Sequence, residues 1–317
     1  MGKLAYIFPG QGAQHPGMGK DLHYRMLLTR FAYEQSDQIR PGTVKQCFEG
    51  TEEELTQTIN AQPCLYATEI ATWYSTHPYR IVPDMVAGFS LGEIPALAVS
   101  GMISTETGMR IVMERARLMP EAVENSRTGM MAVMKLSAEQ VETLCGKFQN
   151  IYPVNYNAPG QTVVAGDNFQ LDRFKNAVKQ EGGRAMPLKV SGGFHSPLLR
   201  DAAKKFGDYL RTIEIRDPDP DIPIYSNYTS RPYPLFDGDY ISLLQNQMCN
   251  PVLWQATIEN MIKAGADKFL ELGPGKTLAG LIKRIDPSVK VYSVNDWESL
   301  EEAMEGVKDH VAKQPVG

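Results

Sequence analysis

The residue of this sequence best suited to covalent chemistry is a serine held between two glycines. Ser90 lies in Gly88-Phe89-Ser90-Leu91-Gly92, between an apolar run and a segment with helical character. Gly-x-Ser-x-Gly between a strand and a helix is typical of a nucleophile elbow, a sharp strand-to-helix turn that exposes the serine hydroxyl. The unpaired N–H groups and the positive dipole end of the new helix would lie beside that hydroxyl. This environment suits attack on a carbonyl group and stabilisation of the resulting oxyanion.

The same segment also fits a purely structural interpretation. Ser90 is followed three residues later by Glu93, and Ser-x-x-Glu is the pattern of a capping box that begins a helix. The motif alone leaves both interpretations open. A nucleophile would additionally require a base and an oxyanion site elsewhere in the chain.

The search for a base is short because the chain has five histidines. His195 differs from the others because it follows Ser191-Gly192-Gly193-Phe194, where a strand is predicted to end and glycines expose the backbone. We therefore favour His195 as the base. No two histidines have the spacing of metal ligands, so we expect no metal site.

Alternating strands and helices must position these two residues. We predict strands at 4–8, 85–89, 224–226, 268–272 and 291–294, and helices at 94–99, 105–123, 198–212, 240–247 and 277–285. Such alternation predicts an α/β domain with a mainly parallel sheet that is covered on both faces. Ser90 would follow the strand at 85–89.

A second unit is predicted inside the first. Strands at 130–136, 151–155, 162–165 and 184–190, with helices at 137–148 and 169–180, give the order β-α-β-β-α-β. This is the ferredoxin-like order. We therefore predict a small ferredoxin-like subdomain at 127–193, inserted into a large domain formed by 1–126 and 194–317.

Composition limits the possible roles. The chain has 317 residues, 43% of them hydrophobic and 22% charged, with a net charge of −5. The negative charge argues against nucleic-acid binding, which needs a basic surface. No apolar run approaches membrane-spanning length, and the four cysteines are too scattered for a disulfide framework. We expect a cytoplasmic protein that binds neither nucleic acid nor membrane.

The motifs together resemble those of the malonyl-CoA:acyl-carrier-protein transacylases, the acyltransferases of fatty-acid and polyketide synthesis. The resemblance covers nearly the whole chain, in the family's order, at 8–14, 88–93, 115–119, 154–161, 194–196, 247–252 and 271–275. It implies an α/β-hydrolase-like core with a ferredoxin-like insert, in agreement with the predicted elements.

The resemblance also implies roles for individual residues. Ser90 would be the nucleophile and His195 its general base, with the backbone N–H groups of Gln11 and Leu91 forming the oxyanion hole. Arg115 matches the arginine that pairs with the free carboxylate of malonate, a group that guanidinium binds through two parallel hydrogen bonds.

Three further positions follow from the same comparison. Gln247 matches the glutamine whose backbone carbonyl orients the histidine. Phe194 resembles the bulky residue of malonyl-selective members, where the ring excludes an α-methyl branch. Phe89 stands where the family usually has histidine. Some trans-acting polyketide acyltransferases carry an apolar residue at this position, and the departure bears on substrate choice and on hydrolysis.

The implied activity is a two-step transfer of malonyl from malonyl-CoA to the phosphopantetheine thiol of acyl carrier protein, with ping-pong kinetics. Malonyl-CoA is the substrate, and we expect no bound cofactor. Because acyl carrier proteins are generally acidic, Lys189, Lys276, Lys283 and Arg284 are candidates for their docking. The alternatives are a trans-acting polyketide acyltransferase and a hydrolase that releases the acyl group to water.

Overall fold

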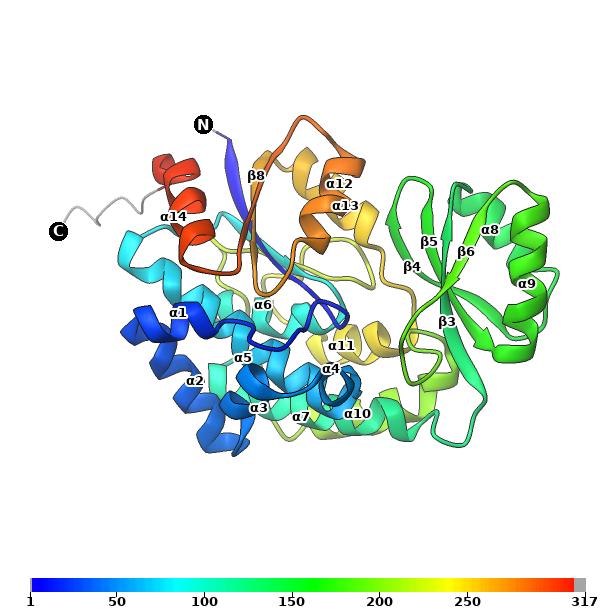
Figure 1. The fold of residues 1–317 in the computed structure, drawn as a ribbon. Helices are drawn as coiled ribbons and strands as arrows, with labels where there is room; N and C mark the ends of the chain where they lie inside the picture. Colours follow the sequence, from blue (N-terminus) through cyan, green and yellow to red (C-terminus); the bar gives the residue numbers. More distant parts are fainter. Residues whose placement is uncertain (1, 311–317) are drawn as a thin grey trace.

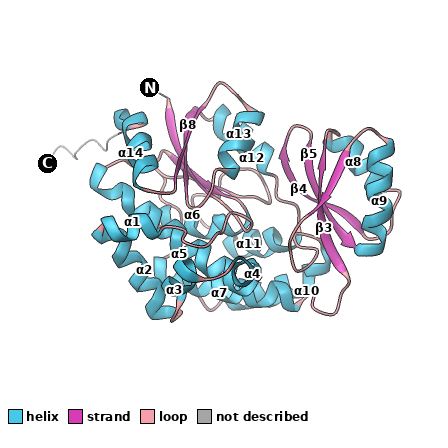
Figure 2. Ribbon diagram, viewed as in Figure 1, coloured by secondary structure: helices cyan, strands magenta, loops and turns pink. Residues whose placement is uncertain are grey.

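The computed structural model describes residues 2–310 of the chain. These residues form two separate sheets. One sheet is covered by helices in the larger part of the molecule, and the other lies at one end (Figures 1 and 2). The first sheet has the strand order β7-β2-β1-β8-β9, and all of its strand pairs are parallel. Its strands are β1 (Lys3–Phe8), β2 (Met85–Gly88), β7 (Ile224–Tyr225), β8 (Ala266–Leu272) and β9 (Lys290–Val294).

The central strand β1 shows why this sheet needs helices on both faces. Leu4, Tyr6 and Phe8 belong to one apolar cluster, whereas Ala5 and Ile7 belong to another. Successive side chains of a strand point to opposite faces, and all five are fully buried. A strand buried on both faces is a nearly continuous apolar run, which is how this segment was identified in the sequence.

Helices from distant parts of the chain supply the two covering layers. The cluster with Leu4 includes residues of α5 (Thr58–Thr76), α6 (Glu93–Val99) and α7 (Thr105–Glu121). The cluster with Ala5 includes residues of α12 (Trp254–Lys263) and α13 (Thr277–Ile285). The remaining helices of the large unit are α1 (Lys20–Arg25), α2 (Leu27–Ile39), α3 (Thr43–Glu49), α4 (Glu52–Thr56), α10 (Arg200–Leu210), α11 (Tyr240–Cys249) and α14 (Trp297–Gly306).

The second sheet is antiparallel and has the order β4-β5-β3-β6. It consists of β3 (Thr128–Met134), β4 (Ile151–Ala158), β5 (Gln161–Asp167) and β6 (Arg184–Pro187), with α8 (Ala138–Cys145) and α9 (Asn168–Gln180) packed on it. This is the predicted ferredoxin-like subdomain, and with the parallel sheet it confirms the predicted fold class. The subdomain boundaries at 126/127 and 193/194 stay a prediction.

Several elements differ in extent from the prediction. The sequence did not predict the helices α1, α2, α3 and α12. It predicted a helix only at 67–74 within α5, which begins at Thr58 and contains Pro63. The strand β6 ends at Pro187, although the pattern predicted a strand to Val190. Proline lacks the N–H that a ladder needs, and β6 is an edge strand that pairs with β3 alone.

The fold brings the functional segments to one edge of the parallel sheet. The carboxyl ends of β1 and β2, at Phe8 and Gly88, lie in register with each other. Ligands of open α/β sheets bind at this edge. Within residues 2–310, no helix combines the length and the apolar character needed to cross a bilayer.

Candidate active site

Ser90 occupies a tight turn between β2 and α6. Its φ is 53°, a left-handed conformation that costs a non-glycine residue energy and persists where the surroundings enforce it. The two glycines permit the turn because a Cβ on Gly88 would lie 1.8 Å from the carbonyl oxygen of Gly92. A Cβ on Gly92 would lie 2.1 Å from the carbonyl oxygen of Phe8. No side chain larger than hydrogen fits at either position.

The capping-box geometry is not formed at this turn. The side chain of Ser90 caps neither the short 3₁₀ turn at Ser90–Gly92 nor α6. The Ser90 N–H donates instead to Oδ1 of Asn227 at 2.6 Å. The carboxylate of Glu93 accepts from the backbone N–H of Asn227 at 3.0 Å and from the hydroxyl of Tyr233 at 2.6 Å.

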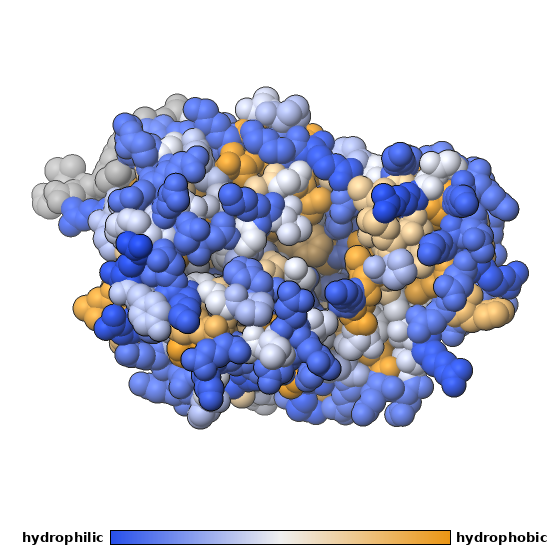
Figure 3. All heavy atoms as spheres, viewed as in Figure 1, coloured by the Kyte–Doolittle hydropathy of each residue, from blue (hydrophilic) through white to orange (hydrophobic). Residues whose placement is uncertain are grey.

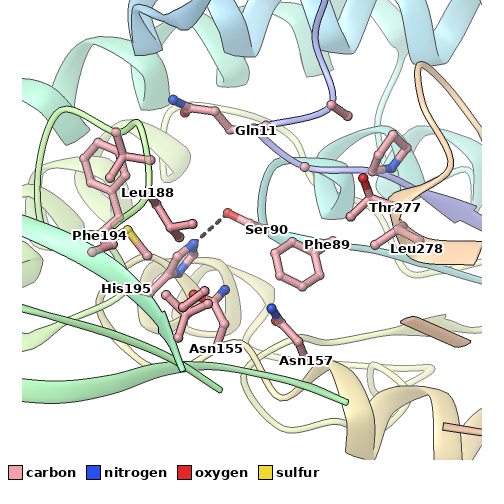
Figure 4. A pocket seen from close by; sticks show the side chains of 18 of the residues that line it. Gln11, Phe89, Ser90, Asn155, Asn157, Leu188, Phe194, His195, Thr277 and Leu278 are labelled. Carbon is pink, nitrogen blue, oxygen red and sulfur yellow. Dashed lines mark hydrogen bonds between the residues drawn. The ribbon is translucent and has the colours of Figure 1, made fainter. Parts of the chain in front are cut away.

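The hydroxyl of Ser90 faces His195, as Figure 4 shows. Ser90 Oγ lies 2.6 Å from His195 Nε2, and His195 Nδ1 lies 2.9 Å from the backbone oxygen of Gln247. Because that carbonyl only accepts, it holds the proton on Nδ1 and leaves Nε2 free to take the serine proton. Burial, and then the positive charge of Arg115, lower the pKa of His195 to about 3. The imidazole is therefore neutral at physiological pH.

Arg115 reaches the same hydroxyl from α7. Its Nη2 donates to Ser90 Oγ at 3.0 Å and to Gln247 Oε1 at 3.2 Å, and its Nη1 donates to Gln62 Oε1 at 2.8 Å. The side chain is 1% exposed, and burial lowers its pKa to about 10, so it remains charged at neutral pH. Arg117, the other arginine of this motif, is exposed and paired with Glu114 and Glu121.

The loop after β1 lies against the turn that carries Ser90. A Cβ on Gly10 would lie 2.5 Å from the backbone oxygen of Phe89, so the two backbones touch. Gln11 follows and lines the cavity on the side of Ser90 away from Asn155 (Figure 4). Leu91 belongs to the first turn after Ser90, where N–H groups lack partners within the helix.

A cavity of about 240 Å³ surrounds Ser90 and opens between the two parts of the molecule. Figure 3 shows the hollow there, with apolar side chains inside it. Phe89 lines one wall, and its ring lies edge-on to Trp254 with centroids 5.5 Å apart. Phe194 lines the cavity beside His195 and is 5% exposed. The wall from the small subdomain includes Met130, Ala132, Asn155, Asn157, Gln161, Val163 and Leu188.

The structure thus brings together all eight residues singled out from the sequence: Gln11, Phe89, Ser90, Leu91, Arg115, Phe194, His195 and Gln247. Sequence reasoning missed Gln62 and Asn227, which accept hydrogen bonds from Arg115 and Ser90. It also missed Tyr233, which donates to Glu93. It considered Glu93 only as part of a helix cap. The motif around Glu93 was the one available signal, because Asn227 and Tyr233 lie in no recognised pattern.

The cations considered for docking have different surroundings. Lys189 and Lys276 are exposed. Arg284 donates to the side chain of Gln161 and to the backbone oxygen of Pro159 at 3.1 Å, which ties α13 to the β4–β5 hairpin. Their role in docking stays a prediction. Among the described residues, no three His, Cys, Asp or Glu side chains converge in an arrangement that could hold a metal ion.

Comparisons with known proteins are consistent with one another. The family model described as "Acyl transferase domain" matches residues 5–300. The malonyl CoA-acyl carrier protein transacylase of Bacillus subtilis (strain 168) is 35% identical over 315 residues, which cover 98% of this chain and 98% of that protein. The malonyl CoA-acyl carrier protein transacylase from Clostridium perfringens has a solved structure with a TM-score of 0.92 and 35% identity, covering 97% of this chain and 98% of that one.

A further solved structure includes a partner. It contains a type II PKS acyl-carrier protein in complex with its malonyl-transacylase. The match has a TM-score of 0.91 and 34% identity, and covers 96% of this chain and 99% of that one.

Proposed function

This chain belongs to the acyl transferase family, and we propose that it transfers a malonyl group from malonyl-CoA to the phosphopantetheine thiol of acyl carrier protein through a malonyl-Ser90 intermediate. The observation that carries the proposal is the position of the Ser90 hydroxyl, 2.6 Å from the imidazole of His195 and 3.0 Å from the guanidinium of Arg115. A base and a carboxylate-binding cation therefore meet at one nucleophile. The reaction needs no cofactor and no metal.

In the first step Ser90 Oγ attacks the thioester carbonyl carbon while its proton passes to His195 Nε2. The developing oxyanion accepts hydrogen bonds from the backbone N–H groups of Gln11 and Leu91, and losing one such donor typically costs about 10²–10³ in turnover. The tetrahedral intermediate then expels the sulfur of CoA, which takes the proton from Nε2. The carbonyl oxygen of Gln247 keeps the ring oriented throughout.

The free carboxylate of malonate pairs with Arg115. Burial is the main cause of the low pKa of His195, and the positive charge of Arg115 is the second. The negative charge of the bound carboxylate offsets this second cause. Binding of the correct acyl group therefore makes the imidazole a stronger base. An uncharged acyl group would leave the guanidinium uncompensated in a buried site.

In the second step the thiol of the carrier gives its proton to His195 Nε2, and its sulfur attacks the malonyl ester. The C–O bond to Ser90 breaks, and Ser90 Oγ takes the proton back. Phe194 closes the cavity beside the acyl group and favours malonyl over α-branched groups. Phe89 forms an apolar wall that limits the access of water to the ester.

A polyketide carrier is the second candidate acceptor. A similar malonyl-transacylase, 34% identical over 96% of this chain, was solved with a type II PKS acyl-carrier protein. The chemistry at Ser90 is the same for both carriers. Only the rate of the second step with each purified carrier distinguishes them.

Intact-mass spectrometry tests the proposal. The protein incubated with malonyl-CoA should gain one malonyl group, and the adduct should be absent from Ser90→Ala. Addition of holo acyl carrier protein should remove the adduct and give malonyl carrier. If neither the adduct nor released CoA is found, the proposed enzymatic activity is refuted. Free malonate formed without a carrier would instead establish a hydrolase.

A further inference from the structure

A buried carboxylate lies directly behind the turn that carries Ser90. Glu93 is the first residue of α6 and is 0% exposed. Its Oε1 accepts the hydroxyl of Tyr233 at 2.6 Å, and its Oε2 accepts the backbone N–H of Asn227 at 3.0 Å and Nε2 of Gln247 at 3.2 Å. An ionised carboxyl group that accepts three donors forms stronger hydrogen bonds than a neutral acceptor in the same place.

Two of these donors belong to residues that hold the turn itself. The side chain of Asn227 spans the turn, accepting the N–H of Ser90 and donating to the carbonyl oxygen of Gly88, both at 2.6 Å. Gln247 donates from Nε2 to the carbonyl oxygen of Ser90 at 2.6 Å, and its own carbonyl accepts Nδ1 of His195. Glu93 is thus one hydrogen bond away from both residues that fix Ser90 and His195.

The neutral side chain of Gln247 lies between the carboxylate of Glu93 and the buried guanidinium of Arg115. The amide of Gln247 donates to Glu93 and accepts from Arg115. The two charges therefore lie at opposite ends of one amide and do not touch. The Nε of Arg115 has no protein partner among the described residues. Glu93 lowers the energy of the buried guanidinium without occupying the donors that a substrate carboxylate needs.

We propose that Glu93 is a positioning residue for acyl transfer, which fixes Ser90 and His195 through Asn227 and Gln247 and balances the charge of Arg115 at a distance. The inference rests on the proposed function, because it assigns the reaction to the hydroxyl of Ser90. It gives the glutamate of the Ser-x-x-Glu pattern a role in chemistry in place of a role in helix capping.

Three variants separate positioning from general stability. Glu93→Gln keeps the size but replaces one acceptor oxygen with a donor and removes the charge. Glu93→Asp keeps the charge on a shorter side chain. The matched control Tyr233→Phe removes a hydrogen bond to the same carboxylate but touches neither Asn227 nor Gln247. All three are compared with the wild type at about pH 8, above the pKa of about 7 to which burial raises Glu93.

Two measurements are made on each variant. The first is kcat and KM for malonyl transfer. The second is the rate at which phenylmethylsulfonyl fluoride modifies Ser90, in which Oγ bonds to sulfur, fluoride leaves and the proton passes to His195. The second measurement needs no malonyl group. If the wild type fails to accept malonyl but is sulfonylated, the proposed function fails while the test of Glu93 still stands.

We expect Glu93→Gln to lower both kcat and the sulfonylation rate about 10²-fold, as small misplacements of reacting groups do, without raising KM for malonyl-CoA. Glu93→Asp should recover about tenfold of that loss, and Tyr233→Phe should stay within about threefold of the wild type while unfolding at a lower temperature. A folded Glu93→Gln with wild-type kcat and sulfonylation rate would overturn the inference. If Glu93→Gln does not fold, Glu93→Asp decides, and wild-type rates in that variant would also overturn it.

Discussion

Replacement of Arg115 by alanine should convert a malonyl-selective site into one that prefers uncharged acyl groups. In the structure the guanidinium makes three hydrogen bonds to the protein, one from Nη1 and two from Nη2. A guanidinium has five N–H donors, so two of them, the buried Nε–H and one Nη1–H, have no partner among the described residues. A carboxylate accepts two parallel N–H groups, and either parallel pair of a guanidinium includes an Nη2–H, so the substrate carboxylate would take the place of Ser90 Oγ or Gln247 Oε1 as an acceptor from Nη2.

The size of the effect follows from these two bonds. Hydrogen bonds to charged groups contribute about 1.5–3 kcal/mol each, so two of them give about 3–6 kcal/mol. Since every 1.4 kcal/mol is a factor of ten, kcat/KM for malonyl-CoA should fall about 10²–10⁴-fold in Arg115→Ala. Acetyl-CoA forms no such pair, so its kcat/KM should not fall in parallel.

The assay is acylation of Ser90 by malonyl-CoA and acetyl-CoA in competition, with each adduct measured by intact mass. Arg117→Ala is the matched control, because Arg117 lies two residues further along α7, is itself exposed and pairs with Glu114 and Glu121. Exposed ion pairs contribute about 0–1 kcal/mol. Thermal unfolding of both variants shows whether a lost activity reflects a lost fold.

Two results would refute the reasoning. One is an Arg115→Ala protein that folds and keeps the wild-type preference for malonyl over acetyl. The other is an Arg117→Ala protein that loses this preference. Either result would mean that the substrate carboxylate is recognised somewhere other than at the guanidinium beside Ser90.

Three other perturbations test separate parts of the site. Burial raises the pKa of Glu93 to about 7 and lowers that of His195 to about 3. A pH–rate profile should therefore show kcat/KM rising with pH through an ionisation near 7, as Glu93 gains its charge. This pH-dependent rise should disappear in Glu93→Gln. A rise that persists unchanged in the variant would assign the ionisation to another group. Gly88→Ala should abolish acylation and lower the free energy of unfolding by about 1–3 kcal/mol or more, because its Cβ would lie 1.8 Å from a backbone oxygen. Gly280→Ala, in a helix with open space around it, should instead raise that free energy by about 0.5–1 kcal/mol in the same denaturation experiment. Phe194→Ala should raise the ratio of kcat/KM for methylmalonyl-CoA over malonyl-CoA about tenfold in a competition assay, and an unchanged ratio would exclude the ring as the selective element.

The fold was predictable where burial leaves a periodic or continuous apolar signal. The strand β1 is buried on both faces, and its apolar run marked it directly. The helix α2 left no such signal, because its buried face carries Thr29, Ala32 and Tyr33 whereas Leu27 and Phe31 are exposed. Small and polar residues form the buried face of α2. The positions of its large apolar residues therefore do not indicate which face is buried.

The site was predictable to the extent that local patterns encode it. Ser90 and His195 each lie two residues from a glycine that marks unusual backbone, and both have positive φ in the structure. The network behind them could not be found in this way. Its hydrogen bonds join Glu93 to Asn227 and Tyr233, 134 and 140 residues away, and such contacts exist only once β2 and β7 have paired.

The two meanings of Ser-x-x-Glu are separated by the glycines that flank the serine. A capping serine has extended backbone and accepts a hydrogen bond from the third residue of the helix. Here the extended conformation belongs to Phe89, with φ −93° and ψ 113°, and Ser90 has already passed into the left-handed region. A helix cap places no demand for glycine two residues before and two residues after the serine. A turn in which those two backbones come into contact does, so Gly88 and Gly92 fit the elbow that the structure shows at Ser90, in which Glu93 is free to bind the residues behind it.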